Sequence, residues 1–289
     1  MGGIIDFNTT CPWELYLFAF IHLGAGIFMY LFDACLLTAT SSCTDTERVI
    51  EKMGILCLFY VGVMFTILTY HNKNEPGKIT TLSNFAAYGA TALLVSVVFF
   101  GNASLGGIER SWMHMGDVLT MIILLAVLTL RVSKADAEWA EKKPLGNMGV
   151  NCKTLLLLIL VIIALKFIAF TDFIDPLTFL ADGAEMTDYA MCMWKFIAVL
   201  MIEIFLAILF SVLFDDDASH ELVVLTVMVM SIVTAGMFYP AKKYFSSWMG
   251  MNADGIWIRL GIMIIVCIVA IVGGRRGSPD RSGYHNVGS

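Results

Sequence analysis

Charged residues are scarce in this chain. They make up 15% of its 289 residues, whereas apolar residues make up 58%. Water-soluble domains carry about 25% charged and about 45–50% apolar residues. The shortage of charge excludes an ordinary soluble domain, and the apolar content excludes a disordered protein, since disordered segments are poor in apolar residues. A protein with several membrane-spanning segments remains.

Basic runs and clustered cysteines are also missing. The 18 Lys and Arg residues are outnumbered by 24 Asp and Glu residues, for a formal net charge of −6, so nothing points to nucleic-acid binding. The seven cysteines are scattered, without a CxxC pair or a Cys/His cluster, so no metal site is predicted. Cys35 and Cys43 lie near the same expected membrane face, which leaves one disulfide as an open alternative.

Motifs for soluble catalysis are lacking as well. The chain has no Walker loop, no HExxH, no Ser/His/Asp set and no Gly-rich dinucleotide turn. The loops between its apolar runs are too short to form a catalytic domain, so an enzyme is not favoured and no cofactor is identified. No motif diagnostic of a membrane family is present. The expected partners are the lipid bilayer and other membrane subunits or further copies of the chain.

Eight apolar segments are long enough, or nearly so, to cross a membrane, which takes about 20 residues. Each segment is bounded by charged residues, Gly or Pro, or a polar turn. The segments are 13–37, 53–70, 82–101, 113–131, 154–171, 191–214, 221–239 and 255–273. The sequence therefore predicts an all-α integral membrane protein with eight transmembrane helices.

Short patterns recur in the same order in the two halves of the chain. The matched sets are 109–116 with 254–261, 44–52 with 187–195, and Asp33 with Asp175, at offsets between 142 and 145. Chance similarity between apolar sequences is the alternative. The pattern predicts a tandem duplication with a four-helix repeat at 1–131, a charged linker at 132–153, a second repeat at 154–276 and a polar tail at 277–289. Because four is even, the repeats would have the same orientation, related by a pseudo-two-fold axis along the membrane normal.

Lys and Arg are unevenly shared between the two sides of the expected membrane. The side with both termini and the connection 132–153 carries ten of them, and the other side carries seven. Positive residues favour the cytoplasmic side, so both termini are predicted to be cytoplasmic. Arg48 and Lys52, which follow the first span, argue for the opposite orientation.

Ionisable residues inside the predicted spans are candidate functional groups, because charge is costly in hydrocarbon. Lys166 and Glu203 are expected at similar depths in the antiparallel neighbouring spans 154–171 and 191–214. Side chains lean toward the N-terminus of their helix, so these two would lean toward each other. The two residues are predicted to pair, either as a structural salt bridge or as a substrate or proton site.

A second group of polar residues is expected in the outer leaflet. His114 and Asp117 share one helix face, three residues apart. If the duplication holds, Asp33 meets His114 where Asp175 meets Arg259. The predicted outer cluster consists of Asp33, His114, Asp117, Asp175 and Arg259. Half-solvated charges at a membrane edge are the alternative interpretation.

Two further features have more than one interpretation. His22, in the middle of the first span, can be a packing residue, a proton relay or one axial ligand of a haem or pigment. The acidic turn Asp215–Glu221 can bind a hard cation, but Asp and Ser are also typical of tight turns and helix N-caps.

The sequence leaves three functions open. A small carrier or channel would have its polar site between the two four-helix halves, nearest to four ionisable residues, Lys166, Glu203, His22 and Asp33. A non-catalytic structural or accessory subunit of a larger membrane assembly fits the short loops and the many small residues. A haem- or pigment-binding membrane protein would use His22. The carrier is narrowly preferred, since buried charge and a parallel duplication both fit it.

Overall fold

The computed structural model describes residues 12–32, 43–104, 119–129, 139–144, 149–170, 177, 186–239 and 253–277. Within these ranges the chain is helical and contains no strand. The helices are α1 (Trp13–Phe32), α3 (Asp45–Asn72), α4 (Pro76–Ser104), Leu119–Thr129, α6 (Cys152–Phe170), α7 (Asp188–Phe214), α8 (Asp217–Phe238) and α9 (Ala253–Gly277).

Each of the eight predicted apolar segments overlaps one of these helices, although the bounds differ and parts of 13–37 and 113–131 lie outside the described residues. Five of them, α1, α3, α7, α8 and α9, are long and apolar enough to cross a membrane. The all-α prediction is confirmed for the described residues, and the apolar helices indicate an integral membrane protein. The count of eight spans stays a prediction.

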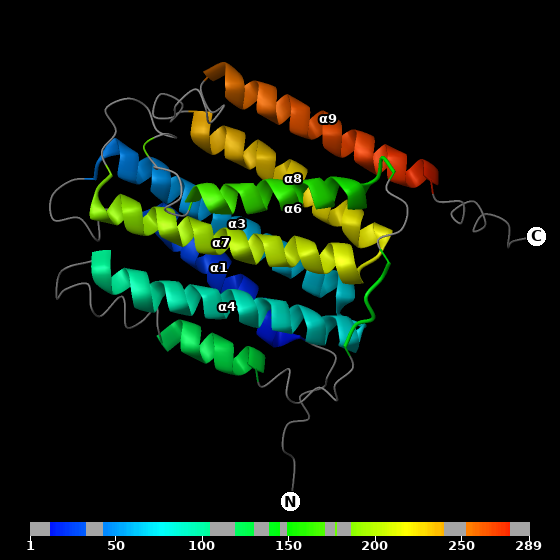
Figure 1. The fold of residues 1–289 in the computed structure, drawn as a ribbon, viewed down its shortest axis with the longest axis horizontal. Helices are drawn as coiled ribbons and strands as arrows, with labels where there is room; N and C mark the ends of the chain where they lie inside the picture. The colour runs from blue at the N-terminus through cyan, green and yellow to red at the C-terminus, as the bar shows by residue number, and fades with distance from the viewer. Residues whose placement is uncertain are drawn as a thin grey trace, which may run out of the picture.

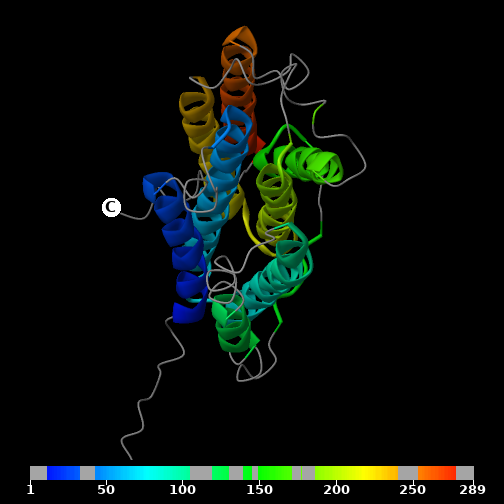
Figure 2. The ribbon, with the colours of Figure 1, turned by 90° about the vertical axis from the view of Figure 1, so that its left-hand side faces the viewer.

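The helices lie roughly parallel or antiparallel to one another in one bundle, with α3 and α7 at its centre (Figure 1). The centre of the bundle is formed where α7 packs against α3, α4 and α6, and where α3 also packs against α1 and α8. α9 lies on the outside against α8, and the view turned by 90° shows the helix Leu119–Thr129 beside α4 (Figure 2). Because α3 and α7 run in the same direction, their starts lie at one end of the bundle and their ends at the other.

The starts of the two central helices are capped in the same way. Thr44 accepts a hydrogen bond from the Glu47 backbone N–H at 3.2 Å, and the Glu47 carboxylate accepts one from the Thr44 N–H at 2.7 Å. This capping box satisfies N–H groups that the first turn of α3 leaves free. Thr187 caps α7 by accepting from the Ala190 N–H at 3.2 Å. The Thr187 hydroxyl also donates to Glu47, which joins the two starts.

A glycine allows α1 to lie close against α3. A Cβ added to Gly62 would come within 2.5 Å of Leu23 Cγ and 2.9 Å of the Ala19 carbonyl oxygen. Small residues at helix contacts permit this close backbone approach in membrane proteins. Any larger residue at 62 would push α1 outward.

The outward faces of the peripheral helices are strongly apolar. Phe20 and Leu31 on α1 are 70% and 67% exposed, and α6 and α9 also expose rows of Leu, Ile and Val. A soluble protein seldom leaves such continuous apolar surfaces open to water. These faces fit contact with lipid chains, which agrees with the apolar composition.

One disulfide is present at the end of the bundle where α3 begins. Cys43, just before the Thr44 cap, is disulfide-bonded. Cys57, Cys152, Cys192 and Cys267 are free. The predicted alternative of a bond with Cys35 involves a residue outside the described ranges.

Candidate functional site

Polar contacts between helices lie mainly along one boundary inside the bundle. This boundary, called the seam here, separates α1, α3 and α4 from α7 and α8. Polar side chains meet across the seam at three levels: at the starts of α3 and α7, at mid-depth, and at the ends of α3 and α7. The Glu47–Thr187 contact described above is the first level.

The central pair, defined as His22 and Glu203, forms the middle level. His22 Nε2 on α1 lies 2.9 Å from Glu203 Oε2 on α7, and the two side chains are 1% and 0% exposed. Both residues are near the middle of their helices. An ionisable pair buried at this depth is costly unless each partner satisfies the other.

The other side of the His22 ring is held by its own helix. Nδ1 lies 2.8 Å from the Phe18 carbonyl oxygen. The ring packs on Phe18 with centroids 4.4 Å apart, and Phe18 packs edge-on against Phe65 of α3 with centroids 4.7 Å apart. Both ring nitrogens of His22 are therefore engaged and the ring orientation is fixed.

The Glu203 carboxylate fits against α4 because residue 89 has no side chain. A Cβ added to Gly89 would lie 2.7 Å from Glu203 Cγ and 2.9 Å from Oε1. Glu203 Oε1, Glu203 Oε2 and His22 Nε2 are all buried without a hydrogen-bond partner among the described residues, so the 2.9 Å contact between Nε2 and Oε2 is an ion-pair contact and not an aligned hydrogen bond. One carboxylate oxygen thus meets His22 while the other faces the surface of α4.

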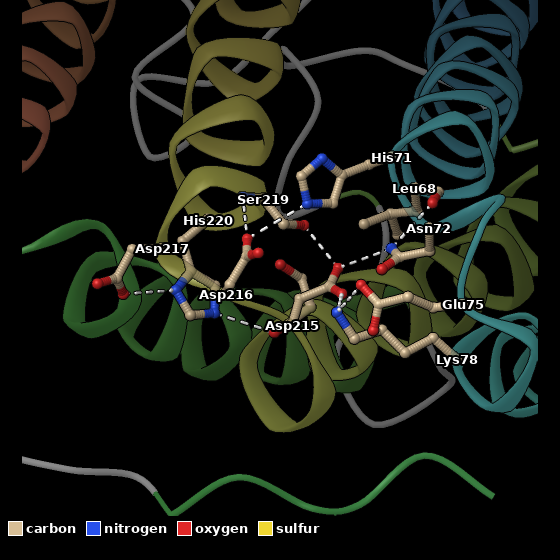
Figure 3. Close-up of polar contacts among 11 residues, drawn as sticks. Leu68, His71, Asn72, Glu75, Lys78, Asp215, Asp216, Asp217, Ser219 and His220 are labelled. Atoms are coloured by element: carbon tan, nitrogen blue, oxygen red, sulfur yellow. Dashed lines mark hydrogen bonds and ion pairs between the residues drawn. The ribbon is translucent and has the colours of Figure 1, made fainter. Parts of the chain in front are cut away.

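The end cluster is centred on Asp215 and joins the ends of α3 and α7 to the starts of α4 and α8 (Figure 3). Asp215 Oδ2 accepts hydrogen bonds from Asn72 Nδ2 at 3.1 Å and from the Ser219 hydroxyl at 2.6 Å. Its Oδ1 lies 3.4 Å from Lys78 Nζ, which also pairs with Glu75 at 2.9 Å. Burial tends to lower the pKa of Lys78, but Glu75 and Asp215 together raise it above its usual value, so Lys78 is charged.

Asp216 extends the end cluster toward α3. Its carboxylate caps α8 by accepting from the Ser219 N–H at 3.0 Å, and its Oδ1 lies 3.2 Å from His71 Nε2 (Figure 3). Burial tends to raise the pKa of Asp216, but the Ser219 hydrogen bond and the nearby His71 lower it below its usual value. The turn and cap interpretation of this acidic segment is thus confirmed for Asp216. Among the described residues no group of three or more acidic, His or Cys side chains is arranged to hold a metal ion.

The structure does not show the predicted pairing of Lys166 with Glu203. Glu203 pairs with His22 instead. α6 ends and α7 begins at the same end of the bundle (Figure 1). Lys166 lies about 6 Å along α6 from that end, and Glu203 lies about 22 Å along α7, at about 1.5 Å per residue. The two residues therefore differ in depth, and Lys166 is exposed on the outside of α6. A functional role for Lys166 stays a prediction.

Most of the predicted outer cluster lies outside the described residues. Asp33, His114, Asp117 and Asp175 belong to the ranges without a description. Arg259 is described and lies exposed on α9. The meeting of these residues stays a prediction.

Sequence reasoning named both members of the central pair without joining them. The missed signal is depth: His22 and Glu203 both lie near the centres of their spans, whereas Lys166 lies close to a span end. Asn72 and Lys78 were not predicted as site residues, because they lie at helix ends, where polar residues are common. Their contacts with Asp215 in the structure are what identify them as site residues.

Two surface hollows lie among the described residues, one between α1 and α3 and one beside the end cluster. One of about 520 Å³ is lined by α1 and α3, including Trp13, Phe20 and Thr66, and faces outward. The other, of about 370 Å³, lies beside the end cluster and includes Lys78, Glu141 and Phe214. Neither hollow is lined by His22 or Glu203, so the central pair is closed off from both.

An extended segment closes the end of the seam. Residues 139–144 cross from α4 to α7, where the Ala140 N–H donates to the Thr81 hydroxyl at 3.0 Å and the Lys143 N–H donates to the Leu213 carbonyl at 2.8 Å. The segment forms one wall of the smaller hollow.

Comparison of the chain with protein-family models, with curated proteins and with solved structures finds no match. The interpretation of the seam therefore depends on its own geometry.

Proposed function

We propose that this protein is a small membrane carrier whose working site is the seam between its first four and last four helices. The observation that supports the proposal is the central pair. His22 comes from the first group of helices and Glu203 from the second, and both are fully buried. Ionisable groups inside a membrane protein are costly and are typical of substrate or ion pathways.

Matching helix bounds favour the tandem duplication that this proposal assumes. The cap Thr44 corresponds to the cap Thr187 at an offset of 143, and α3 and α7 begin one residue later at the same offset. α4 begins at Pro76 and α8 at Asp217, an offset of 141. Two similar units facing each other across a seam are a common basis for alternating access, in which one unit rocks against the other.

The seam has separate contacts at its two ends, as a carrier needs. Glu47 and Thr187 close one end, and Asp215 with Asn72 and Lys78 closes the other. Each closure consists of a few hydrogen bonds or ion pairs, so one can open while the other stays shut. The present structure, with both closed around the central pair, corresponds to an occluded state.

The disulfide at Cys43 favours one orientation. Disulfides persist in oxidising compartments and are rare in the cytosol. The end of the bundle where α3 begins would then face away from the cytoplasm, and the end cluster would face it. This orientation agrees with cytoplasmic termini, as the distribution of Lys and Arg predicts.

Access to the seam from each side tests the proposal without a known substrate. Ser83 and Ser96 are buried on α4 on opposite sides of Gly89. Single variants Ser83→Cys and Ser96→Cys would be prepared with every cysteine outside the Cys43 disulfide replaced, and treated in membrane vesicles with a small charged thiol reagent. We expect Ser83→Cys to react from the side of the end cluster and Ser96→Cys from the opposite side.

Asp217, whose side chain is 91% exposed, supplies the matched control. Asp217→Cys should react fully from the end-cluster side whatever the state of the seam. Protection of both buried cysteines under all conditions, with Asp217→Cys reactive, would rule out a carrier.

A structural or accessory subunit is the second candidate, and one observation favours it. Neither described hollow reaches the central pair, as expected for a static salt bridge in a scaffold. Protection of both buried cysteines would select this function. Haem or pigment binding through His22 receives no support, since Phe18 and Glu203 already occupy both ring nitrogens.

A further inference from the structure

The hydrogen bonding of His22 determines where its first proton lies. The Phe18 carbonyl oxygen, 2.8 Å from Nδ1, can only accept a hydrogen bond. Nδ1 therefore carries a proton, and the tautomer follows from this contact. In a neutral ring, Nε2 would then have a lone pair and no proton.

The contact with Glu203 requires a second proton. Nε2 lies 2.9 Å from Glu203 Oε2. A lone pair on nitrogen facing a lone pair on oxygen at this distance would be repulsive, and at exposures of 1% and 0% the two atoms are shielded from bulk water. The pair therefore holds a proton on one of its two members, either on the imidazole beside a carboxylate or on the carboxyl group beside a neutral imidazole.

The surroundings of the pair are mainly apolar. Whether His22 and Glu203 stay in contact therefore depends on the proton that they share. Among the described residues, the charge that acts on His22 is that of Glu203. α3 contributes Phe65 through its packing on Phe18, and α4 contributes Gly89. The charged residues Glu14 on α1 and Lys78 on α4 are in the first turns of their helices, about 12 Å and 16 Å along them from the levels of His22 and Gly89.

We infer that the central pair is a proton-binding site that holds one proton between His22 and Glu203 when the seam is closed and opens when that proton leaves. The inference rests on the proposed carrier function and names its coupling ion. Release breaks the Nε2–H or Oε2–H bond, and the proton passes to water. The pair then has one net negative charge, which is too costly to leave in an apolar interior, so the carboxylate must reach water.

The first test detects the shared proton in the unsubstituted protein, and two variants serve only to assign its signals. Full-length protein with ¹⁵N-labelled histidine, in lipid vesicles at neutral pH, would be studied by solid-state NMR and by infrared spectroscopy. His22→Gln assigns the His22 signal among the five histidines, and Glu203→Gln assigns the carboxyl band. We expect either an imidazolium at His22 or a protonated carboxyl at Glu203. A neutral His22 beside an ionised Glu203 would overturn the inference.

The second test measures coupling to the seam. Thiol labelling of Ser83→Cys would be followed from pH 5 to pH 9, with each rate divided by that of Asp217→Cys to remove the pH dependence of the thiol itself. We expect labelling to become at least tenfold faster at high pH, and this dependence to vanish with Glu203→Gln. Arg259→Gln, which changes an exposed residue on the outer helix α9, should leave it unchanged.

The outcomes separate the two proposals. Labelling from both sides without pH dependence would keep the carrier and overturn the proton site. Absence of labelling at every pH would overturn both the carrier and the coupling, even with a shared proton. Labelling that depends on pH only with Glu203 present would support both.

Discussion

Gly89 on α4 and Glu203 on α7 are in such close contact that a methyl group at 89 would overlap the glutamate side chain. The added Cβ would lie 2.7 Å from Cγ and 2.9 Å from Oε1 of Glu203. The carboxylate has little room to move away, because His22 holds its other oxygen. The central pair thus depends on three helices. α1 and α7 supply the two side chains, and α4 supplies a glycine that leaves room for the Glu203 carboxylate.

Replacing Gly89 should disturb the central pair although no charge is changed. Gly89→Ala should lower the apparent melting temperature, because the methyl group displaces Glu203 from His22. Gly24→Ala is the matched control, since nothing lies within 4 Å of a Cβ at 24. Both changes gain about 1 kcal/mol of helix propensity, so their difference isolates the steric effect. Equal melting temperatures would contradict the described contact.

Removing both members of the central pair should cost less stability than the two single removals added together. A buried charge left without its partner destabilises a protein by about 3–5 kcal/mol. His22→Leu and Glu203→Leu should each lower thermal stability in detergent, and the double variant should lose less than the sum of the two. Additive losses in this cycle would mean that the residues do not interact.

Two acidic residues that lie two positions apart in the sequence, Asp215 and Asp217, should differ in their contribution to stability. Asp215 is buried and accepts from Asn72 and Ser219, whereas Asp217 is 91% exposed. Asp215→Ala leaves Lys78 and Asn72 short of a buried partner and should cost about 1–3 kcal/mol or more. Asp217→Ala should be nearly neutral. Thermal unfolding of the two variants side by side measures the difference.

Acid should weaken the end cluster through Asp216. Its pKa is lowered in the folded protein, so its stabilising contribution is complete above the ordinary pKa of about 4 and is lost as the pH falls through the folded value. The apparent melting temperature of the wild type should therefore fall below about pH 4 more steeply than that of Asp216→Asn. Parallel curves for the two proteins would assign the acid sensitivity to other groups.

The disulfide at Cys43 should be visible by thiol counting. In denatured protein, reductant should expose two additional thiols to a mass-tagging maleimide, since one disulfide contains two sulfurs. Cys43→Ser should free the partner thiol, so that reductant adds none. An unchanged count on reduction of the wild type would show that the bond is absent.

The helical segments could be predicted from the sequence because each is an uninterrupted apolar run between polar boundaries. The true helix starts were not predicted, since the predicted spans begin at 53 and 191 whereas Thr44 and Thr187 cap helices that start at Asp45 and Asp188. The arrangement of the helices could not be predicted in this way. All-round apolar helices leave no polar face to indicate which side is inward, so packing order depends on shape and on small residues such as Gly62 and Gly89.

The same limit explains the site. Depth can be counted along a sequence, but the direction in which a side chain points around its helix cannot be read from an apolar run. Lys166 was joined to Glu203 because their spans are consecutive and similar depths were expected, yet Lys166 is exposed and lies close to the end of α6. His22 belongs to a helix far away in sequence, and only the tertiary fold brings it to Glu203.

The distance in sequence between His22 and Glu203 has a consequence for synthesis of the protein. His22 enters the membrane with the first helix, and its partner is made about 180 residues later, which at about 5–20 residues per second is roughly 10–40 s. During this interval His22 has no carboxylate beside it and must remain neutral or stay near water. The contact that joins α1 to α7 can form only once α7 has been made, so α1 stays without this partner through most of synthesis.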